Sequence, residues 1–188
     1  LAVVGRVSAS TQNQALAALV FLYGQVLRAP ALELEELVRA RVPQRLPVVL
    51  TQDEARALLA RVGGESHLVA ALLYGAGLRL LECLRLRVKD LDLERGEIVV
   101  RDGKGRKDRV VPVVGRALEA LDLYLHDVRP ELVKDPREAA LFLTRRGTRV
   151  VVKSIQYLVR MNAQAAGIAA PVTPHALRHG CATHLLQG

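Results

Sequence analysis

The spacing of hydrophobic residues along the chain predicts a mainly helical protein with a small amount of β-structure. In most segments apolar residues recur at intervals of three and four, which is typical of helices that bury one face. The expected helices cover residues 11–28, 51–62, 67–75, 78–86, 115–126, 153–166 and a last helix from Thr173-Pro174 onward. A shorter helix is expected after Pro30, where Leu32, Leu34, Leu37 and Val38 lie.

Polar residues and glycines predict where several of these helices begin and end. Thr51 and Glu54 form a T-x-x-E capping box that opens one helix. Gly63-Gly64 stops that helix, and Ser66 is expected to cap the next. Gly75-Ala76-Gly77 breaks the chain again, which leaves Arg79 near a helix N-terminus, where free N–H groups favour anions.

Two runs of β-branched residues indicate a hairpin. Residues 97–102 and 109–113 flank Gly103-Lys104-Gly105-Arg106-Lys107, so the hairpin has a basic tip. A second short strand pair is expected over 141–144 and 148–152, around a glycine. In the last helix, Leu177, Cys181 and Leu185 form a stripe that we expect to face the core.

The fold class expected from these elements is α+β, mainly helical, with a small antiparallel sheet. Pro43 and Pro47 restrict the residues before them to extended geometry, so residues 43–47 are expected to be a linker between residues 1–42 and 48–188. The chain begins with Leu1 and ends at Gly188 directly after an apolar run, and we therefore expect it to be a piece of a longer protein.

The charge of the chain favours a polyanionic partner. The 188 residues carry 27 Lys and Arg against 19 Asp and Glu, a formal charge of +8. Most of the cations are arginines, whose planar fork matches two phosphate oxygens at once. Nucleic acid is the simplest such partner, although a codon bias toward arginine would produce the same composition.

Several broad classes are disfavoured. The longest apolar runs fall short of the roughly 20 residues of a membrane span, and no secretory leader opens the chain. Two cysteines make no disulfide framework, so we expect a cytoplasmic protein without membrane association.

Common catalytic templates are missing from the sequence. There is no G-x-S-x-G elbow, and Gly103-Lys104 is followed by glycine, unlike a Walker loop. His175, His179, Cys181 and His184 cluster, but no adjacent glutamate or second ligand group accompanies them, so no metal site is expected.

The chemistry-bearing set that remains is cationic: Arg79, Lys104, His175 and Arg178. His175 and Arg178 are three residues apart on one helix and project from the same face. Each of these residues alone is more often an ordinary surface or turn residue. Together they suit one task, which is to hold a phosphodiester and stabilise charge on its oxygens during transfer.

The order of these motifs resembles the tyrosine recombinases of the phage integrase family. The motifs are G-x-G-L-R-x-x-E at 75–82, a strand-GKG-strand hairpin, and H-x-L-R-H-x-x-A-T-H-L-L at 175–186. The stretch LRLRVKDLDLERGEIVVRDGKGRKDRVVPV, residues 84–113, is similar to integron integrases and Xer-type recombinases. STQNQALAALVFLY, residues 10–23, resembles the last helix of their DNA-clamping domain.

The resemblance implies a role for each matching residue. Arg79 and Arg178 would grip the scissile phosphate, and Glu82 would support Arg79. Lys104 would donate a proton to the leaving 5′ oxygen, and His175 would handle protons and bind phosphate. Arg106 and Lys107 would join Arg79, Lys104 and Arg178 in contacting DNA. The resemblance also implies a protein that acts on duplex DNA without cofactor or metal, as a homo-oligomer, a tetramer on DNA.

Two features depart from the family pattern. Cys181 stands where relatives usually have Phe, which affects packing and not chemistry. The family continues past the last helix to a G-H motif and the nucleophilic tyrosine, whereas Tyr23, Tyr74, Tyr124 and Tyr157 all precede His175. Site-specific strand cleavage through a 3′-phosphotyrosyl intermediate would therefore need a tyrosine from elsewhere. A DNA-binding module without catalysis, a type IB topoisomerase-like activity and a basic helical protein of another kind remain alternatives.

Overall fold

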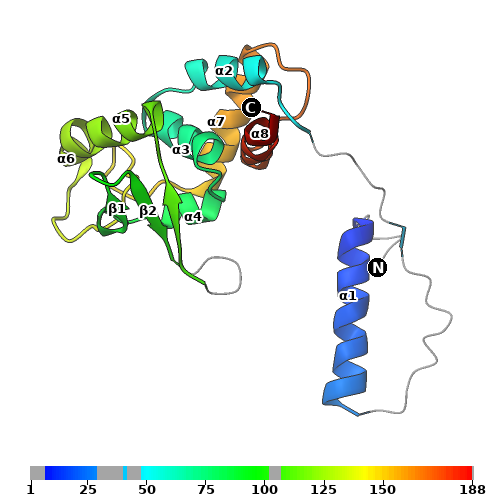
Figure 1. Ribbon diagram of the computed structural model, residues 1–188. Coiled ribbons are helices and arrows are strands. Elements are labelled where there is room, and N and C mark those ends of the chain that lie inside the picture. Colours follow the sequence, from blue (N-terminus) through cyan, green and yellow to red (C-terminus); the bar gives the residue numbers. More distant parts are fainter. Residues whose placement is uncertain (1–6, 29–39, 42–47, 102–106, 188) are drawn as a thin grey trace. The chain divides into compact units, whose positions relative to one another are not determined.

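The computed structural model describes residues 7–28, 40–41, 48–101 and 107–187. The chain divides into two compact units, Leu1–Leu46 and Pro47–Gly188 (Figure 1). The expected helix after Pro30 and the expected linker at 43–47 lie outside the described residues.

The described part of the first unit contains one long helix. Helix α1 (Ala9–Phe21) continues into a π-helical turn, η1 (Leu22–Val26), in the region predicted as helix. Ser8 caps α1 by accepting a hydrogen bond from the backbone N–H of Thr11 at 3.2 Å. None of the residues in α1 is buried within this unit.

The second unit is built around helix α3 (Gly64–Gly75), which contacts α2 (Gln52–Arg61), α4 (Leu80–Arg85), α5 (Arg116–Leu123), α7 (Val152–Ala165) and α8 (Pro174–Gln187) (Figure 1). This central position explains why α3 is apolar on most sides. Its buried residues are Ser66, Leu68, Val69, Ala70, Leu72 and Leu73.

A small antiparallel sheet covers one side of the helices. Its strands are β1 (Leu91–Asp92), β2 (Glu97–Val100) and β3 (Arg109–Pro112), in that order, with a 3-10 turn, η3 (Val88–Asp90), before β1. In the β2–β3 pair Val100 lies opposite Arg109. The mainly helical architecture with one small antiparallel sheet, predicted from the sequence, is confirmed.

One continuous hydrophobic core joins the helices and the sheet. Its largest fully buried side chains come from every part of the unit and include Leu58, Leu72, Leu78, Ile98, Leu121, Phe142, Ile155 and Leu177. Between α5 and α7 the chain passes through η4 (Tyr124–Val128) and α6 (Arg129–Leu132). Among the described residues no helix combines the length and the hydrophobicity that crossing a bilayer requires.

The structure corrects three local predictions. Helix α3 begins at Gly64, with Gly63 as its N-cap, so Ser66 lies inside the first turn as a buried helix residue and is not the cap. The second strand pair is reduced to a single bridge between Leu143 and Arg149. Leu185 does not face the core: its exposed fraction is 75%, because the described chain contacts this end of α8 on another side, where Tyr74 packs against His184.

Candidate active site

Arg79 lies at the start of α4, where the tight turn before the helix positions it. Gly77 has a φ of +61°, a conformation that glycine adopts without steric cost, and Leu78 is fully buried directly after it. The buried leucine anchors the turn, so the next residue emerges at the first turn of the helix. The side chain of Arg79 is 41% exposed and therefore open to a ligand.

Glu82, one turn along α4, holds Arg79 in two ways. Its carboxylate accepts a hydrogen bond from the backbone N–H of Arg79 at 2.9 Å and another from the Arg79 guanidinium at 2.7 Å. The first bond caps the helix, and the second fixes the direction of the arginine fork. The predicted support of Arg79 by Glu82 thus has a direct contact in the structure.

A second arginine, which the sequence analysis did not select, binds the same carboxylate. Arg109 opens β3 and donates to the two oxygens of Glu82 at 3.0 and 2.7 Å. Burial would by itself raise the pKa of Glu82, but the hydrogen bonds from Arg109 and Arg79 lower its pKa to about 2. Glu82 is therefore a nearly buried anion clamped between two guanidinium groups.

The alternation of buried and exposed positions along β3 contains information about the partner of Arg109. Along β3, Arg109 and Val111 occupy the more buried face and Val110 the exposed one. A charged residue at an inward position of a strand needs a buried partner of opposite charge. The alternation could therefore have predicted an acid facing Arg109.

Helix α8 supplies the other half of the site. Pro174 is its first residue, and His175 and Arg178 follow on one face. Burial, and then the positive charge of Arg79, lower the pKa of Arg178, while Glu82 raises it. Burial, followed by the electrostatic effects of His179, Arg178 and Arg79, lowers the pKa of His175. The lowered pKa favours the neutral form of His175, which can accept a proton or a hydrogen bond.

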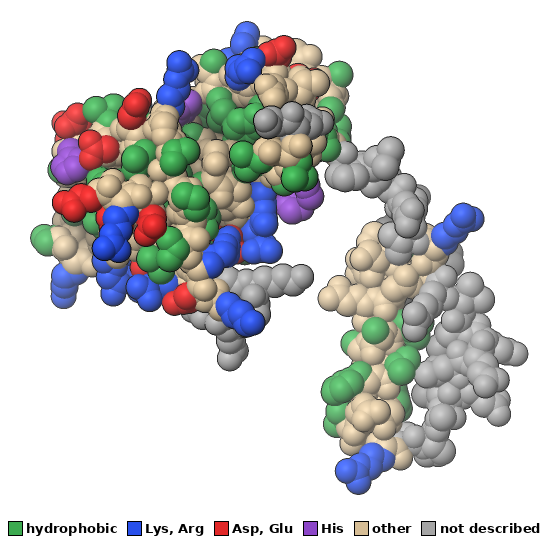
Figure 2. All heavy atoms as spheres, viewed as in Figure 1, with side chains coloured by type: hydrophobic (Ala, Val, Ile, Leu, Met, Phe, Trp, Pro, Cys, Tyr) green, Lys and Arg blue, Asp and Glu red, His purple; other side chains and the backbone are tan. Residues whose placement is uncertain are grey.

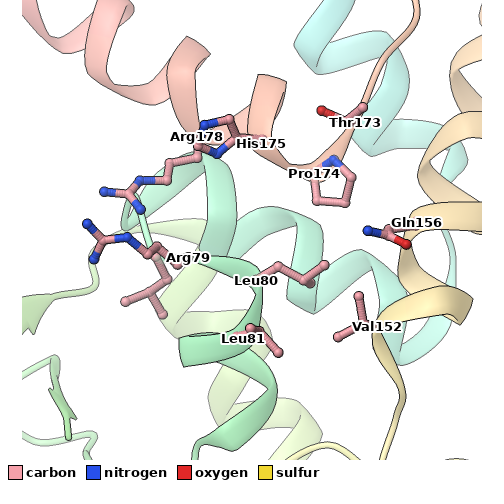
Figure 3. Close-up of a pocket in the computed structure, with 10 residues that line it drawn as sticks. Arg79, Leu80, Leu81, Val152, Gln156, Thr173, Pro174, His175 and Arg178 are labelled. Atoms are coloured by element: carbon pink, nitrogen blue, oxygen red, sulfur yellow. The ribbon is translucent and has the colours of Figure 1, made fainter. Parts of the chain in front are cut away.

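The residues from α4 and α8 meet around two pockets. The first, the apolar-walled pocket, has a volume of about 340 Å³ and is lined by Arg79, His175 and Arg178 on one side and by Leu80, Val152 and Pro174 on the other. Figure 3 shows the guanidinium groups of Arg79 and Arg178 side by side at its edge. The second, the cationic pocket, has a volume of about 320 Å³ and is lined by Arg79, Arg109 and Arg178 together with Lys107.

The structure thus brings together Arg79, Glu82, Lys107, His175 and Arg178 of the predicted set. Lys104 and Arg106 lie outside the described residues. No group of three potential metal ligands occurs among the residues that the structure describes.

Chemically, the arrangement fits a bound phosphate. Arg79, Arg178 and Lys107 border the same pocket, and the nearby carboxylate of Glu82 is already paired with the guanidinium groups of Arg79 and Arg109. The imidazole of His175, whose lowered pKa favours its neutral form, lines the neighbouring pocket with Arg79 and Arg178. Such a site can bind a phosphodiester, stabilise charge that develops on its oxygens, and relay a proton.

Comparison with known proteins identifies the family of this chain. Residues 48–188 match the Phage integrase family. An "Integrase/recombinase" of Escherichia coli is 40% identical over 217 residues, covering 97% of this chain and 64% of the relative. "Tyrosine recombinase XerA" of Thermococcus kodakarensis is 41% identical over 162 residues, covering 82% of this chain and 54% of the relative.

Solved structures share the fold. A crystal structure of XerA recombinase superposes with a TM-score of 0.67 at 32% identity, covering 99% of this chain and 65% of that one. The XerH site-specific recombinase, solved bound to its difH substrate in a pre-cleavage complex, superposes with a TM-score of 0.74 at 25% identity, covering 97% and 56%. The chain thus spans between half and two thirds of the length of these relatives. With a family match over three quarters of its residues and a shared fold, this chain belongs to the phage integrase family of tyrosine recombinases.

Proposed function

We propose that this chain provides the phosphate-binding machinery of a site-specific DNA recombinase. In the proposed reaction a tyrosine oxygen attacks the scissile phosphorus, the bond from phosphorus to the 5′ oxygen breaks, and a 3′-phosphotyrosyl bond forms. Attack by a 5′-hydroxyl of another strand reverses these steps and rejoins the DNA. The observation that carries the proposal is that Arg79 and Arg178, which lie far apart in the sequence at α4 and in α8, border the same two pockets.

Each residue of the site has a defined task in this proposal. Arg79 and Arg178 bind the non-bridging oxygens and stabilise the charge that they gain in the transition state. Lys104 gives its proton to the departing 5′ oxygen, and His175, in its neutral form, accepts and returns protons at the phosphate. Glu82 and Arg109 are positioning residues, because they act through Arg79.

The tyrosine nucleophile is proposed to come from outside residues 1–188. Among the described residues that line the two pockets there is no tyrosine. The hydroxyl of Tyr74 is hydrogen-bonded to Nδ1 of His184 at 2.8 Å, and that of Tyr124 to the carbonyl of Leu141 at 3.1 Å. A further part of the same polypeptide or a partner protein would supply the nucleophile.

Duplex DNA is the proposed substrate and partner. Lys and Arg side chains gather along the lower edge of the second unit, over the sheet and α4 (Figure 2). Relatives of this fold have been solved on DNA, including XerH on difH. Phosphate contacts from such an edge would make the affinity strongly dependent on salt. Arg106 and Lys107 are proposed to join Arg79, Lys104 and Arg178 in these contacts.

The proposal extends to the organisation of the whole protein. Residues 1–42 would be part of a helical domain that clamps DNA, and residues 48–188 most of the catalytic domain. The protein would act as a homo-oligomer, a tetramer on its DNA site, in the cytoplasm.

A trapping experiment tests the proposed function. A target duplex, selected by binding from a random pool, is nicked so that cleavage releases a short fragment and traps the covalent complex. We expect the complete gene product to form a protein–DNA adduct that survives SDS, and residues 1–188 to bind the duplex without forming one. Failure of the complete product to form an adduct on bound DNA would contradict the recombinase proposal. An adduct formed by residues 1–188 alone would contradict the external tyrosine, and relaxation of non-specific plasmid would favour a type IB topoisomerase-like activity.

A further inference from the structure

A second clamped arginine pair lies next to the proposed site. Asp90, at the end of η3, is 3% exposed and lies between Arg87 and Arg101. Arg87 donates to it from Nε at 2.9 Å and from Nη2 at 3.1 Å, and Arg101 donates from Nε at 2.9 Å. Burial would raise the pKa of Asp90, but hydrogen bonds from Arg87 and Arg101 lower it to about 2. The carboxylate is therefore fully ionised and held by two cations.

This cluster repeats the design of the Glu82 cluster. In both, an arginine three residues before the acid donates its backbone N–H and its guanidinium to the carboxylate. In both, a second arginine lies in or directly beside the sheet. Arg109 opens β3, and Arg101 follows Val100, which is the last residue of β2 and the cross-strand partner of Arg109. One sheet and the turns beside it thus present two clamped arginine pairs in succession.

The second pair opens onto a pocket of its own, the flanking pocket, with a volume of about 420 Å³. Arg85, Arg87, Arg101 and Arg149 supply its positive charge, and Glu82 and Asp90 its negative charge. Because Glu82 also holds Arg79, the flanking pocket adjoins the proposed active site.

The donors of this pocket are only partly used. Arg87 donates from Nε and Nη2 to Asp90, and its Nη1 makes no hydrogen bond within the described chain. Arg85 is exposed and forms no ion pair with a described residue. Arg149 makes only a longer contact, 3.5 Å from Nε to Glu138. Since the buried acid already orients the clamped forks, an incoming anion orders few side chains, which lowers the cost of binding.

We propose that the flanking pocket binds a second backbone phosphate of the DNA substrate, distinct from the phosphate between Arg79 and Arg178. This inference rests on the proposed function. Because Glu82 and Asp90 are already paired with arginines, the remaining guanidinium donors of the pocket favour an incoming anion that accepts several hydrogen bonds, as a phosphodiester does. The second contact would fix the register of the strand, so that the scissile phosphate meets Arg79, and it would take no part in bond breaking.

The test uses residues 1–188 and duplex DNA. The variant Arg85→Gln/Arg149→Gln removes two cations of the flanking pocket without uncovering a buried acid, and Arg101→Gln removes one clamped fork. The control Arg137→Gln/Arg160→Gln removes two exposed arginines that line none of the three pockets. Binding is measured by fluorescence anisotropy over a range of salt, with circular dichroism to establish that each variant is folded.

We expect both flanking-pocket variants to bind several-fold more weakly and to lose about 0.9 from the slope of log affinity against log salt, the change for one phosphate contact. The control should keep the slope of the unaltered chain. A flanking-pocket variant that is folded and matches the control would overturn this inference and leave the proposed function standing. Absence of DNA binding by the unaltered chain would overturn both.

Neutral methylphosphonate groups, placed one at a time along the selected duplex, locate the contact. For the unaltered chain we expect weaker binding at two separate backbone positions. Arg85→Gln/Arg149→Gln should become insensitive at one position, and Arg79→Ala/Arg178→Ala at the other. Loss of sensitivity at the same position in both variants would show a single phosphate and contradict the second site.

Discussion

At the scale of single residues, Glu82 determines the geometry of the proposed site. One carboxylate orients Arg79 from its own helix and Arg109 from the sheet, and it is only 9% exposed. A charged pair held in this way is fixed before the substrate arrives, which is the condition for effective electrostatic stabilisation. Arg109 should therefore matter to cleavage although it is proposed to act through Arg79.

We expect Arg109→Ala in the complete gene product to slow cleavage about 100-fold, the order of loss that follows from a small misplacement of a reacting group. Arg109→Lys keeps the charge but not the fork, so its rate should be intermediate. DNA affinity should change only a few-fold in both. The measurement is the single-turnover cleavage rate, with Arg95→Ala as a control because that arginine is exposed in the β1–β2 turn. An equal loss of affinity and rate would show that Arg109 only binds DNA.

The depressed pKa of Glu82 predicts an acid-sensitive fold. Its pKa falls from 4.5 to about 2 on folding, so the unfolded chain binds more protons at pH 3 than the folded chain does. The stability contributed by Glu82 is therefore present above pH 4.5 and lost as the pH falls toward 2. Urea unfolding at a series of pH values should show a weaker pH dependence in Glu82→Gln than in the unaltered chain. Asp90, whose pKa also falls to about 2 on folding, accounts for the pH dependence of stability that remains in Glu82→Gln. Identical pH dependence in both proteins would contradict the clamp.

Lys104 stays a prediction of the sequence, and a modified substrate tests it. If Lys104 protonates the 5′ oxygen, Lys104→Ala should slow cleavage of ordinary DNA. A substrate with a 5′-thiol leaving group needs no such proton and should restore the rate. A variant that remains slow on the thiol substrate would exclude the role of acid.

At the scale of elements, a helix with a strong local signal was predicted well, and very short elements were not. The Thr51–Glu54 capping box forms both of its hydrogen bonds, at 2.8 and 3.2 Å, and α2 begins where it predicts. Strand β1 has two residues and α6 has four, too few for any periodicity to appear. Such elements are determined by tertiary contacts, and a local pattern cannot show them.

The turn before α4 is expected to require glycine at position 77. Gly77 needs its positive φ, and a Cβ there would stand 3.5 Å from Sγ of Cys181, an ordinary contact. The cost of Gly77→Ala is therefore conformational, and we expect a loss of about 1–2 kcal/mol in the free energy of unfolding. Gly63→Ala is the matched control, because Gly63 has a φ of −108° and open space around its Cα. Equal stabilities of the two variants in urea would contradict this account of the turn.

At the scale of the whole molecule, the proposed site depends on a convergence that no local pattern contains. Arg79, His175 and Arg178 were identified from motifs, and the fold brings them to one pocket. Arg109, which connects α4 to the sheet through Glu82, was missed. A long-range ion pair gives only a weak signal in the alternation of buried and exposed residues along a strand. The exposed end of α8 was missed for a related reason, since helical spacing predicts a common face but not what covers it.

The most direct measurement of the central claim is a double-mutant cycle on Arg79 and Arg178. In the complete gene product, Arg79→Ala and Arg178→Ala should each reduce cleavage of the nicked duplex to a small residual rate and leave its binding within a modest factor. Because both arginines are proposed to hold one phosphate, the double variant should cleave no more slowly than either single variant. Near-normal cleavage by either single variant, or effects on rate that simply multiply in the double variant, would contradict the claim that one phosphate lies between them.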